Sequence, residues 1–349
     1  MTTLAPPLLA WFDTHGRHDL PWQRDRTPYS VWVSEIMLQQ TQVGTVIPFY
    51  RRFMRRFPTL SALAAAPLDD VLNCWSGLGY YARARNLWHA SRIVVEVHGG
   101  ELPTAFDALH ALPGIGRSTA GAILAQAHDA RWPILDGNVK RVLARYHAVA
   151  GWPGLPTVAK ELWRHAEAHT PHERVADYTQ AIMDLGATLC ARTRPACTVC
   201  PLASDCAAAR AGTQALYPAA RPKRKRAQRQ VAVLVIRDLE GRVLLERRPA
   251  RGIWGGLYSL PELAADDSPR EWCARVLGAT VAVEHVLATI EHAFTHFDLD
   301  LTPRLLELAG TPAVVNDGDD WHWCRPGTEL GVGVPAPVAA LLSGGLVPA

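Results

Sequence analysis

Four cysteines within seventeen residues limit what this chain can fold into more than any other feature. They follow the spacing Cys-x6-Cys-x2-Cys-x5-Cys, at Cys190, Cys197, Cys200 and Cys206. A single short loop of this kind can bring four thiolates around a zinc ion or an iron–sulfur cluster. Structural zinc sites more often consist of two close cysteine pairs, whereas here Cys197 and Cys200 form the one close pair. The spacing predicts a metal-binding loop and leaves both metals open.

The distribution of apolar residues predicts two domains of different class. Apolar residues three and four apart predict helices over 30–55, 59–74, 81–98, 117–128, 138–149 and 157–169. A basic, proline-punctuated run at 221–226 is typical of a linker, which we place at 217–229. Beyond it, 230–237, 241–247, 281–290 and 297–307 predict strands, and 269–277 predicts a helix. We expect an all-α domain at 1–216 and a smaller α+β domain at 230–349.

Charge is distributed unevenly along the chain. Residues 1–229 hold 27 Lys and Arg against 17 Asp and Glu, whereas residues 230–349 hold 9 against 16. A basic half indicates a polyanionic partner or a solvated basic surface, and charge alone does not choose between them. There is no apolar run of membrane-spanning length and no signal-peptide pattern. We expect a cytoplasmic, nucleoid-associated monomer without a membrane partner.

The segment Leu112–Ala120 (LPGIGRSTA) is typical of a tight turn that opens a helix. Gly114 and Gly116 allow the sharp turn, and the amides that follow are unpaired at the helix N-terminus. Such amides bind phosphate without reading base sequence. The alternative is an ordinary connection between two helices.

Two carboxylic residues are candidates for acid–base chemistry. Glu35 lies in the largely apolar stretch VWVSEIMLQQTQ, where desolvation would raise its pKa; the alternative is a helix-surface glutamate. Asp136 precedes a predicted helix, so the alternative for it is a plain N-cap. One protonated and one ionised carboxyl group suit cleavage of a glycosidic bond, which needs a proton donor and an anion beside a cationic sugar.

The motifs WVSEIMLQQTQV, GLGYYARARNL, LPGIGRSTAGAIL and PILDGNVKRVLAR are followed by the cysteine loop, and the family similarity that they carry spans residues 8–215. In this order they resemble the MutY-type adenine DNA glycosylases of the helix-hairpin-helix, iron–sulfur superfamily. The resemblance implies one 4Fe-4S cluster on the four cysteines. It also implies base excision repair, in which adenine opposite 8-oxoguanine or guanine in duplex DNA is removed by hydrolysis of its N-glycosidic bond.

The same resemblance assigns roles to single residues. Glu35 would protonate the adenine, Asp136 would stabilise the sugar cation, and Asn138 would position the water and the carboxylates. Gly114 and Gly116 would contact the DNA backbone. For the wedge that replaces an extruded base, the resemblance indicates Gln40, Thr41 and Tyr80, with packing or capping as the alternative.

Ser118 separates two branches of this superfamily. Endonuclease III-like enzymes carry a lysine here that forms an imine with the sugar, and a serine cannot form one. The residue therefore predicts a glycosylase without strand-cutting activity, with Ser118 itself in an auxiliary DNA-binding role. A bifunctional lyase and a catalytically silent damage sensor are the rival interpretations.

The second domain resembles the 8-oxoguanine-recognising domain of the same family, which is similar to Nudix hydrolases. A Nudix enzyme would present paired glutamates on a helix to hold magnesium, but Arg270–Arg275 (REWCAR) lacks the pair. We therefore expect a binding domain, against the rival of a Nudix phosphohydrolase. Thr295 and His296 match the loop that inspects 8-oxoguanine in the family.

Overall fold

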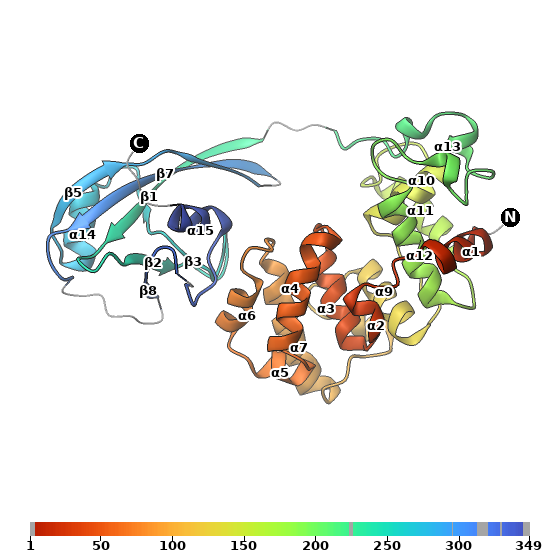
Figure 1. Cartoon of the computed structure of the whole chain (residues 1–349), viewed down its shortest axis with the longest axis horizontal. Helices are drawn as coiled ribbons and strands as arrows, with labels where there is room; N and C mark the ends of the chain where they lie inside the picture. Colours follow the sequence, from red (N-terminus) through yellow and green to blue (C-terminus); the bar gives the residue numbers. More distant parts are fainter. Residues whose placement is uncertain (1–3, 223–225, 295, 313–319, 329, 345–349) are drawn as a thin grey trace. The chain divides into compact units, whose positions relative to one another are not determined.

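The computed structural model describes residues 4–222, 226–294, 296–312, 320–328 and 330–344 (Figure 1). They form two compact units, one made of residues 1–65 and 86–223 and the other of residues 66–85 and 224–349. Within the described residues, none of the helices combines the length and apolar character that crossing a membrane requires.

The first unit is helical, as predicted. Its elements are α1 (Ala5–His15), α2 (Pro21–Arg24), α3 (Pro28–Leu38), α4 (Val43–Arg56), α5 (Leu60–Ala65), most of α7 (Ala82–His98), α8 (Phe106–His110), α9 (Arg117–His128), α10 (Gly137–Tyr146), α11 (Pro156–His169), α12 (Val175–Thr188), the short helix Cys197–Val199, α13 (Ala207–Arg210) and the short helix Gln214–Leu216. Two predicted helical segments are each divided. The 30–55 segment breaks between Leu38 and Val43, and the 59–74 segment breaks between α5 and α6 (Leu68–Trp75).

Helix α3 shows why the chain breaks where it does. Thr27 caps its N-terminus by accepting a hydrogen bond from the Ser30 amide, and Pro28 occupies the first turn, where its missing N–H costs nothing. Nearly the whole helix is buried, including Trp32 at 0% exposure. The helix ends before Gln40, whose φ of +59° cannot continue it. The following residues are thereby left on the wall of a cleft.

Helices α1, α10, α11 and α12 share one apolar core, in which Leu143, Leu162 and Ala181 are fully buried. Gly186 of α12 lies against the first turn of α10. A Cβ at Gly186 would lie 2.6 Å from Cβ of Asn138, so this close helix contact requires glycine. The contact fixes where α10 begins, and with it the position of Asp136.

The described residues of the second unit form a mixed sheet of eight strands, β1 (Ala227–Arg237), β2 (Val243–Arg247), β3 (Tyr258–Ser259), β4 (Glu262–Leu263), β5 (Val281–Val286), β6 (Ile290–Ala293), β7 (Phe297–Leu308) and β8 (Trp321–Cys324). The main path is β3-β2-β1-β7-β5. Strands β1 and β7 run parallel, with Ala227 opposite Phe297 and Arg237 opposite Glu307.

Alternation along β1 divides the core of this sheet into two layers. Val233 and Val235 pack on the side of α15 (Ala336–Ser343), whereas Leu234 and Ile236 pack on the side of α14 (Pro269–Leu277). This is the period of two that places successive strand residues on opposite faces. The predicted α+β class is confirmed. Strand β1 begins at Ala227, inside the stretch predicted as linker, because it pairs with β7 along its whole length.

Residues 66–85, which include α6 and the start of α7, group with the C-terminal residues. Tyr81 Oη donates to the Val334 carbonyl at 2.9 Å, and Asp69 forms an ion pair with Arg247. A Cβ at Gly333 would lie 3.0 Å from the Leu72 backbone, so this contact also relies on a glycine. The sequence did not indicate this grouping.

Candidate active site

An open cleft of about 970 Å³ lies in the first unit. Its walls come from residues at the ends of α3, α9 and α10 and along α12. The sequence-predicted residues that line it are Glu35, Gln40, Thr41, Ser118, Asp136 and Asn138. Trp22 of α2 also lines the cleft and packs edge-on against Tyr50. Segments as far apart in the sequence as Arg17 and Arg192 thus meet at one site.

Glu35 lies half-buried at the wall of this cleft. Desolvation, with a smaller contribution from the negative charge of Asp136, raises its pKa to about 7. A hydrogen bond of 2.8 Å from Gln126 Nε2 to Glu35 Oε1 acts in the opposite direction. The expected rise in pKa is therefore present, and this carboxyl group can hold a proton near neutral pH.

Asp136 is the N-cap of α10. Its Oδ1 accepts a hydrogen bond of 2.8 Å from the Val139 amide, and the carboxyl group lines the cleft as well. Burial raises its pKa too, so the two carboxyl groups are not shifted in opposite directions. They differ in their neighbours. The amides of Val139 and Asn138 and the charges of Arg141 and Lys140 all favour the Asp136 anion.

Asn138 and Ser118 are held beside Asp136. Arg141 Nη2 donates to Asn138 Oδ1 at 2.9 Å and to the Gly186 carbonyl at 2.7 Å. The Leu135 amide donates to Ser118 Oγ at 2.9 Å. Hydrogen bonds thus fix Ser118 of α9 and Asn138 of α10 next to Asp136, and Arg141 links Asn138 to α12.

A row of polar side chains behind Glu35 was not anticipated from the sequence. It consists of Gln126, Gln23, Gln180, Asp184 and Arg17, which are linked by hydrogen bonds. Gln23, Gln126 and Gln180 are at most 9% exposed, and Asp184 is fully buried. Glutamines are rarely so deeply buried. Gln126 and Gln180 are 103 and 157 residues from Gln23 in the sequence, so no local motif could have revealed this row.

The predicted hairpin joins α8 to α9. Gly114 has φ of +82°, and a Cβ there would lie 2.8 Å from Asn86 Cβ, so this position requires glycine. Gly116 is the N-cap of α9 and is exposed, with nothing within 4 Å of an added Cβ. Gln39 Nε2 donates to the Gly114 carbonyl at 3.4 Å, which ties the hairpin to the cleft wall.

The predicted wedge residues belong to both units. Gln40 and Thr41 border the cleft, whereas Tyr80 belongs to the second unit. Tyr80 is 48% exposed, and both it and Gln40 adopt positive φ values, of +51° and +59°. Non-glycine residues in this conformation are strained, which is common at functional sites. His296 is exposed, and Thr295 lies outside the described residues.

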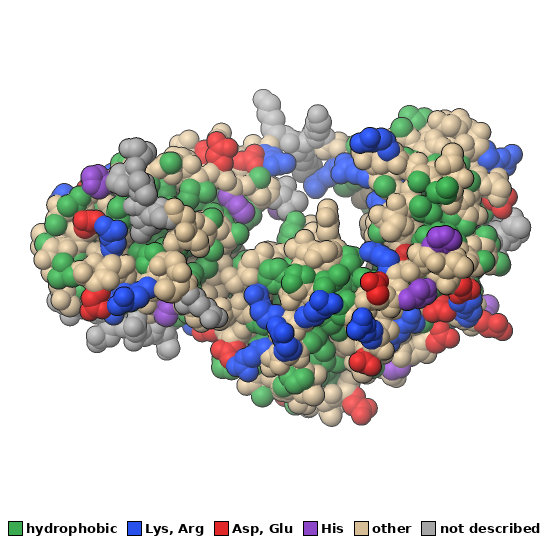
Figure 2. All heavy atoms as spheres, viewed as in Figure 1, with side chains coloured by type: hydrophobic (Ala, Val, Ile, Leu, Met, Phe, Trp, Pro, Cys, Tyr) green, Lys and Arg blue, Asp and Glu red, His purple; other side chains and the backbone are tan. Residues whose placement is uncertain are grey.

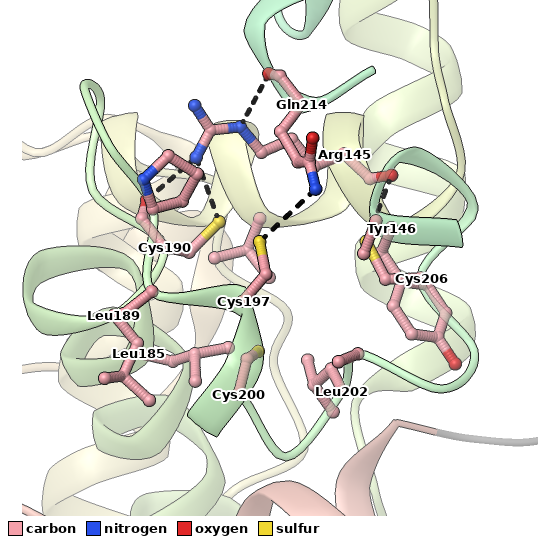
Figure 3. A pocket seen from close by; sticks show the side chains of 15 residues that line it. Arg145, Tyr146, Leu185, Leu189, Cys190, Cys197, Cys200, Leu202, Cys206 and Gln214 are labelled. Carbon is pink, nitrogen blue, oxygen red and sulfur yellow. Dashed lines mark hydrogen bonds between the residues drawn. The ribbon is translucent and has the colours of Figure 1, made fainter. Parts of the chain in front are cut away.

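The four cysteines of the predicted loop surround a small apolar pocket, together with Leu185, Leu202 and Tyr146 (Figure 3). Arg145 Nη1 lies 3.3 Å from Cys190 Sγ, and Gln214 Nε2 lies 3.6 Å from Cys197 Sγ. Donors of this kind suit metal-bound thiolates, which carry negative charge. The donor set therefore fits a cluster held by four sulfurs.

Arg145 closes this loop. Its guanidinium group donates to the carbonyls of Cys190, Ala191, Arg192, Gln214 and Tyr217, at 2.8 to 3.3 Å. The side chain is 4% exposed and extends from α10, the helix that Asp136 caps. One buried arginine thus connects the cysteine loop to the helix of the candidate site.

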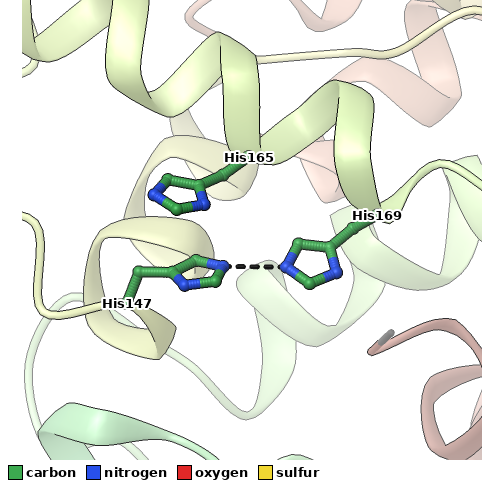
Figure 4. A group of neighbouring side chains, drawn as sticks. All are labelled: His147, His165 and His169. Carbon is green, nitrogen blue, oxygen red and sulfur yellow. Dashed lines mark hydrogen bonds between the residues drawn. The ribbon is translucent and has the colours of Figure 1, made fainter. Parts of the chain in front are cut away.

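Three histidines form a separate cluster, between the end of α10 and α11 (Figure 4). The Leu4 amide donates to His169 Nδ1 at 3.4 Å, so the proton of the neutral ring is on Nε2, which lies 2.8 Å from His147 Nε2. The rings of His147 and His165 stack at 3.6 Å and 15°. Because the rings of His147 and His165 lie one above the other, their nitrogens lie in two layers. This arrangement fits the packing of neutral rings. Burial lowers the pKa of each histidine, which agrees with neutral rings.

Basic side chains gather over the part of the first unit that holds α4 (Figure 2). Arg51, Arg52, Arg55 and Arg56 of this helix are exposed. Arg83, by contrast, is 7% exposed and donates to the Gly79 carbonyl at 3.1 Å. Its burial reflects packing over the rings of Trp75 and Tyr80.

The chain is similar to known proteins over nearly its whole length. It is 36% identical to the adenine DNA glycosylase of Buchnera aphidicola subsp. Schizaphis graminum over 335 residues, 96% of each chain. It is also 35% identical to that of Rattus norvegicus over 376 residues, 90% of this chain and 72% of the rat protein.

The chain belongs to the adenine DNA glycosylase family.

Two family models match the chain of this adenine DNA glycosylase family member. Residues 33–168 match the HhH-GPD superfamily of base excision DNA repair proteins, and residues 232–344 match the NUDIX domain. Among solved structures, a thermostable thymine-DNA glycosylase superposes with a TM-score of 0.53 at 28% identity, over 59% of this chain and 94% of that one. The expected family and fold class are therefore confirmed.

Proposed function

We propose that this protein removes adenine mispaired with 8-oxoguanine or guanine from duplex DNA, by hydrolysis of the N-glycosidic bond. The observation that carries the proposal is the presence of Glu35 and Asp136 in one cleft, each in a different electrostatic environment. Membership of the adenine DNA glycosylase family supports the base specificity. Hydrolysis without strand cutting follows from Ser118, because a serine hydroxyl cannot form an imine with the sugar.

Glu35 would act as the acid. With a pKa near 7, its carboxyl group holds a proton at physiological pH and can deliver it to the departing adenine, which then leaves as a neutral base. The nearby Asp136 anion favours this protonated state. Glu35 is accessible from the cleft, as an extruded base would require.

Asp136 would supply the anion. Loss of adenine leaves a cationic, oxocarbenium-like sugar, which a fixed negative charge stabilises more in the transition state than in the ground state. The two amides and two cations beside Asp136 oppose the rise in its pKa that burial causes, and so favour its ionised form. Asn138, fixed by Arg141, would orient the attacking water.

The backbone of the DNA would be held by the hairpin. Gly116 leaves the first amides of α9 exposed beside the cleft, and Arg117 adds a positive side chain at the same helix end. The arginines of α4 offer further charge for phosphates. Gln40, Thr41 and Tyr80 would fill the gap left by the extruded adenine.

We propose a division of labour between residues 1–216, which carry out catalysis, and residues 230–349, which recognise 8-oxoguanine, with 217–229 as a linker. His296 and Thr295 would belong to the recognition surface. The rings of Trp254, His292 and Phe294 contact one another in tilted and edge-on arrangements next to this loop, and they are aromatic groups of the kind that contact bases. The second unit also lacks paired carboxylates on α14, which argues against magnesium-dependent hydrolysis.

Cys190, Cys197, Cys200 and Cys206 would hold one 4Fe-4S cluster. Burial raises the pKa of the Cys200 thiol to about 11, so a thiolate there needs a metal cation to be stable. When bound, the cluster supplies a rigid cross-link within the loop, and all four sulfurs are committed to it.

Single-turnover release of adenine tests the proposal. Duplexes with A:8-oxoguanine, A:G and A:T would be compared with wild type and Glu35→Gln. We expect release from the two mispairs only, and none with the variant. Tight binding of A:8-oxoguanine without release would identify a damage sensor, and strand cutting with a borohydride-trapped adduct would identify a lyase.

A further inference from the structure

A continuous row of hydrogen bonds connects the Arg17–Asp184 ion pair to the carboxyl group of Glu35. Arg17 donates to Asp184 through its amide, Nε and Nη2, at 2.7 to 2.9 Å. Gln180 Nε2 donates to Asp184 Oδ1 at 2.6 Å. Gln23 Nε2 donates to Gln180 Oε1 at 2.6 Å and to Gln126 Oε1 at 3.0 Å, and Gln126 Nε2 donates to Glu35 Oε1 at 2.8 Å.

The direction of this row follows from its charged end. An ionised Asp184 can only accept hydrogen bonds, so the amide NH2 group of Gln180 must face it. The oxygen of Gln180 then faces Gln23, which must present its own NH2 group. Gln126 consequently directs its oxygen toward Gln23 and its NH2 group toward Glu35. Each amide has one compatible orientation once Asp184 is charged.

The orientation of the Gln23 amide leaves one buried polar atom unsatisfied. It uses its NH2 group for both neighbours, and its Oε1 is buried without a hydrogen-bond partner among the described residues. A buried acceptor without a partner is unfavourable. Reversing Gln23 would place its oxygen against the oxygens of both Gln180 and Gln126. The charge of Asp184 outweighs the unsatisfied oxygen.

We propose that the Arg17–Asp184 pair sets the protonation geometry of Glu35 through these three glutamines, with Gln126 as the positioning residue. Because Gln126 presents a donor to Oε1, that oxygen stays an acceptor and the transferable proton is held on Oε2. This inference rests on the proposed role of Glu35 as the acid, and it specifies which oxygen delivers the proton.

This row of hydrogen bonds from Arg17 to Glu35, which we call the relay, also limits how strongly Glu35 holds its proton. Burial and the Asp136 charge raise its pKa, and the Gln126 donor opposes them. An acid of too high pKa transfers its proton poorly, so a value near the working pH favours catalysis. Desolvation thus raises the pKa of Glu35, and a hydrogen bond whose direction is fixed by the Arg17–Asp184 ion pair lowers it.

Two variants interrupt the relay without adding charge. Gln126→Leu removes the donor, and Gln23→Leu leaves Gln126 in place but releases its amide to turn its oxygen toward Glu35. Both should move the alkaline limb of the pH profile of adenine release to higher pH, by roughly one unit for Gln126→Leu. Thr170→Val, which removes a buried hydrogen bond to the Ala166 carbonyl outside the cleft, is the matched control and should leave the profile unchanged.

Infrared titration of the Glu35 carboxyl band gives a readout that does not need activity. The band is isolated by subtracting the spectrum of Glu35→Gln, and its midpoint should rise in Gln126→Leu and Gln23→Leu. An unchanged midpoint in folded Gln126→Leu overturns the inference. If wild type released no adenine while the midpoint still shifted, the proposed function would fail and the relay would stand. If Gln126→Leu does not fold, Gln23→Leu decides by the same criterion.

Discussion

The backbone amide of Leu135 donates a hydrogen bond to the hydroxyl oxygen of Ser118, 2.9 Å away. This bond joins the first turn of α9 to the residue before Asp136, so the side chain at 118 lies at the cleft beside the proposed anion. A longer side chain at this position would extend into the cleft toward the sugar.

Ser118→Lys should therefore add lyase chemistry. An amine at this position can attack the sugar carbon of the abasic product and form an imine, which serine cannot do. We expect a covalent DNA adduct after borohydride treatment, at levels well above wild type, with adenine release retained. Ser118→Met, of comparable length without the amine, serves as the control. Equal trapping in the two variants would contradict the placement of residue 118.

The rate of adenine release should fall as the pH rises above about 7. Glu35 must be protonated to act, and its pKa is raised to about 7. Single-turnover rates from pH 5 to pH 9 should decline about tenfold per unit on the alkaline side. A rate that stays flat up to pH 9 would show that another group delivers the proton.

Glu35→Gln should be more stable than wild type at alkaline pH. The folded-state pKa of about 7 lies above the usual value of 4.5, so the protonated carboxyl stabilises the fold at low pH and that contribution is lost as the pH rises through 7. The difference in unfolding free energy should reach about 2 kcal/mol at pH 8.5, after allowance for partial solvent access, and vanish near pH 4. Denaturant titrations at the two pH values measure it, and a constant difference would mean that Glu35 is not desolvated.

Substitutions at Asp136 should separate its charge from its capping role. Asp136→Asn keeps a side-chain oxygen for the Val139 amide, so the unfolding free energy should change little while adenine release is lost. Asp136→Ala should also cost about 1 kcal/mol of stability, because the cap is gone. If Asp136→Asn retained wild-type rates, the residue would be a cap and nothing more.

Gly186→Ala should disturb the site without touching its chemical groups. The added methyl would lie 2.6 Å from Asn138 Cβ and 3.1 Å from the backbone of Asn138, so α10 must shift. We expect a loss of about 1–3 kcal/mol of stability and a reduced rate of adenine release. Gly44→Ala meets no atom within 4 Å in α4 and should not lower stability. Thermal unfolding compares the two.

The sequence predicted those parts of the protein that depend on local pattern. The helix at 269–277 follows from its periodicity, and the rise in the pKa of Glu35 follows from the apolar residues on both sides of it. The break at Gln40 was missed because the apolar pattern of 30–55 continues across it, and a positive φ leaves no mark on periodicity. The strand from Ala227 was missed because a basic, polar segment forms a strand only when β7 lies beside it.

The hydrogen-bonded row behind Glu35 is harder to predict from the sequence than these local features. Gln23, Gln126 and Gln180 come from three helices, and an isolated glutamine gives no sign of burial. Asp136 shows a different limit. Its N-cap role was visible, but its position in the cleft depends on the contact between Gly186 and Asn138, which only the packing of α12 on α10 reveals.

Arg145 has a consequence for how the cysteine loop keeps its shape. By collecting five carbonyl groups of the cysteine loop, this arginine gathers the sulfur atoms with contacts that the polypeptide makes by itself. A metal centre held by the four cysteines would then occupy a loop whose shape this one side chain already helps to maintain.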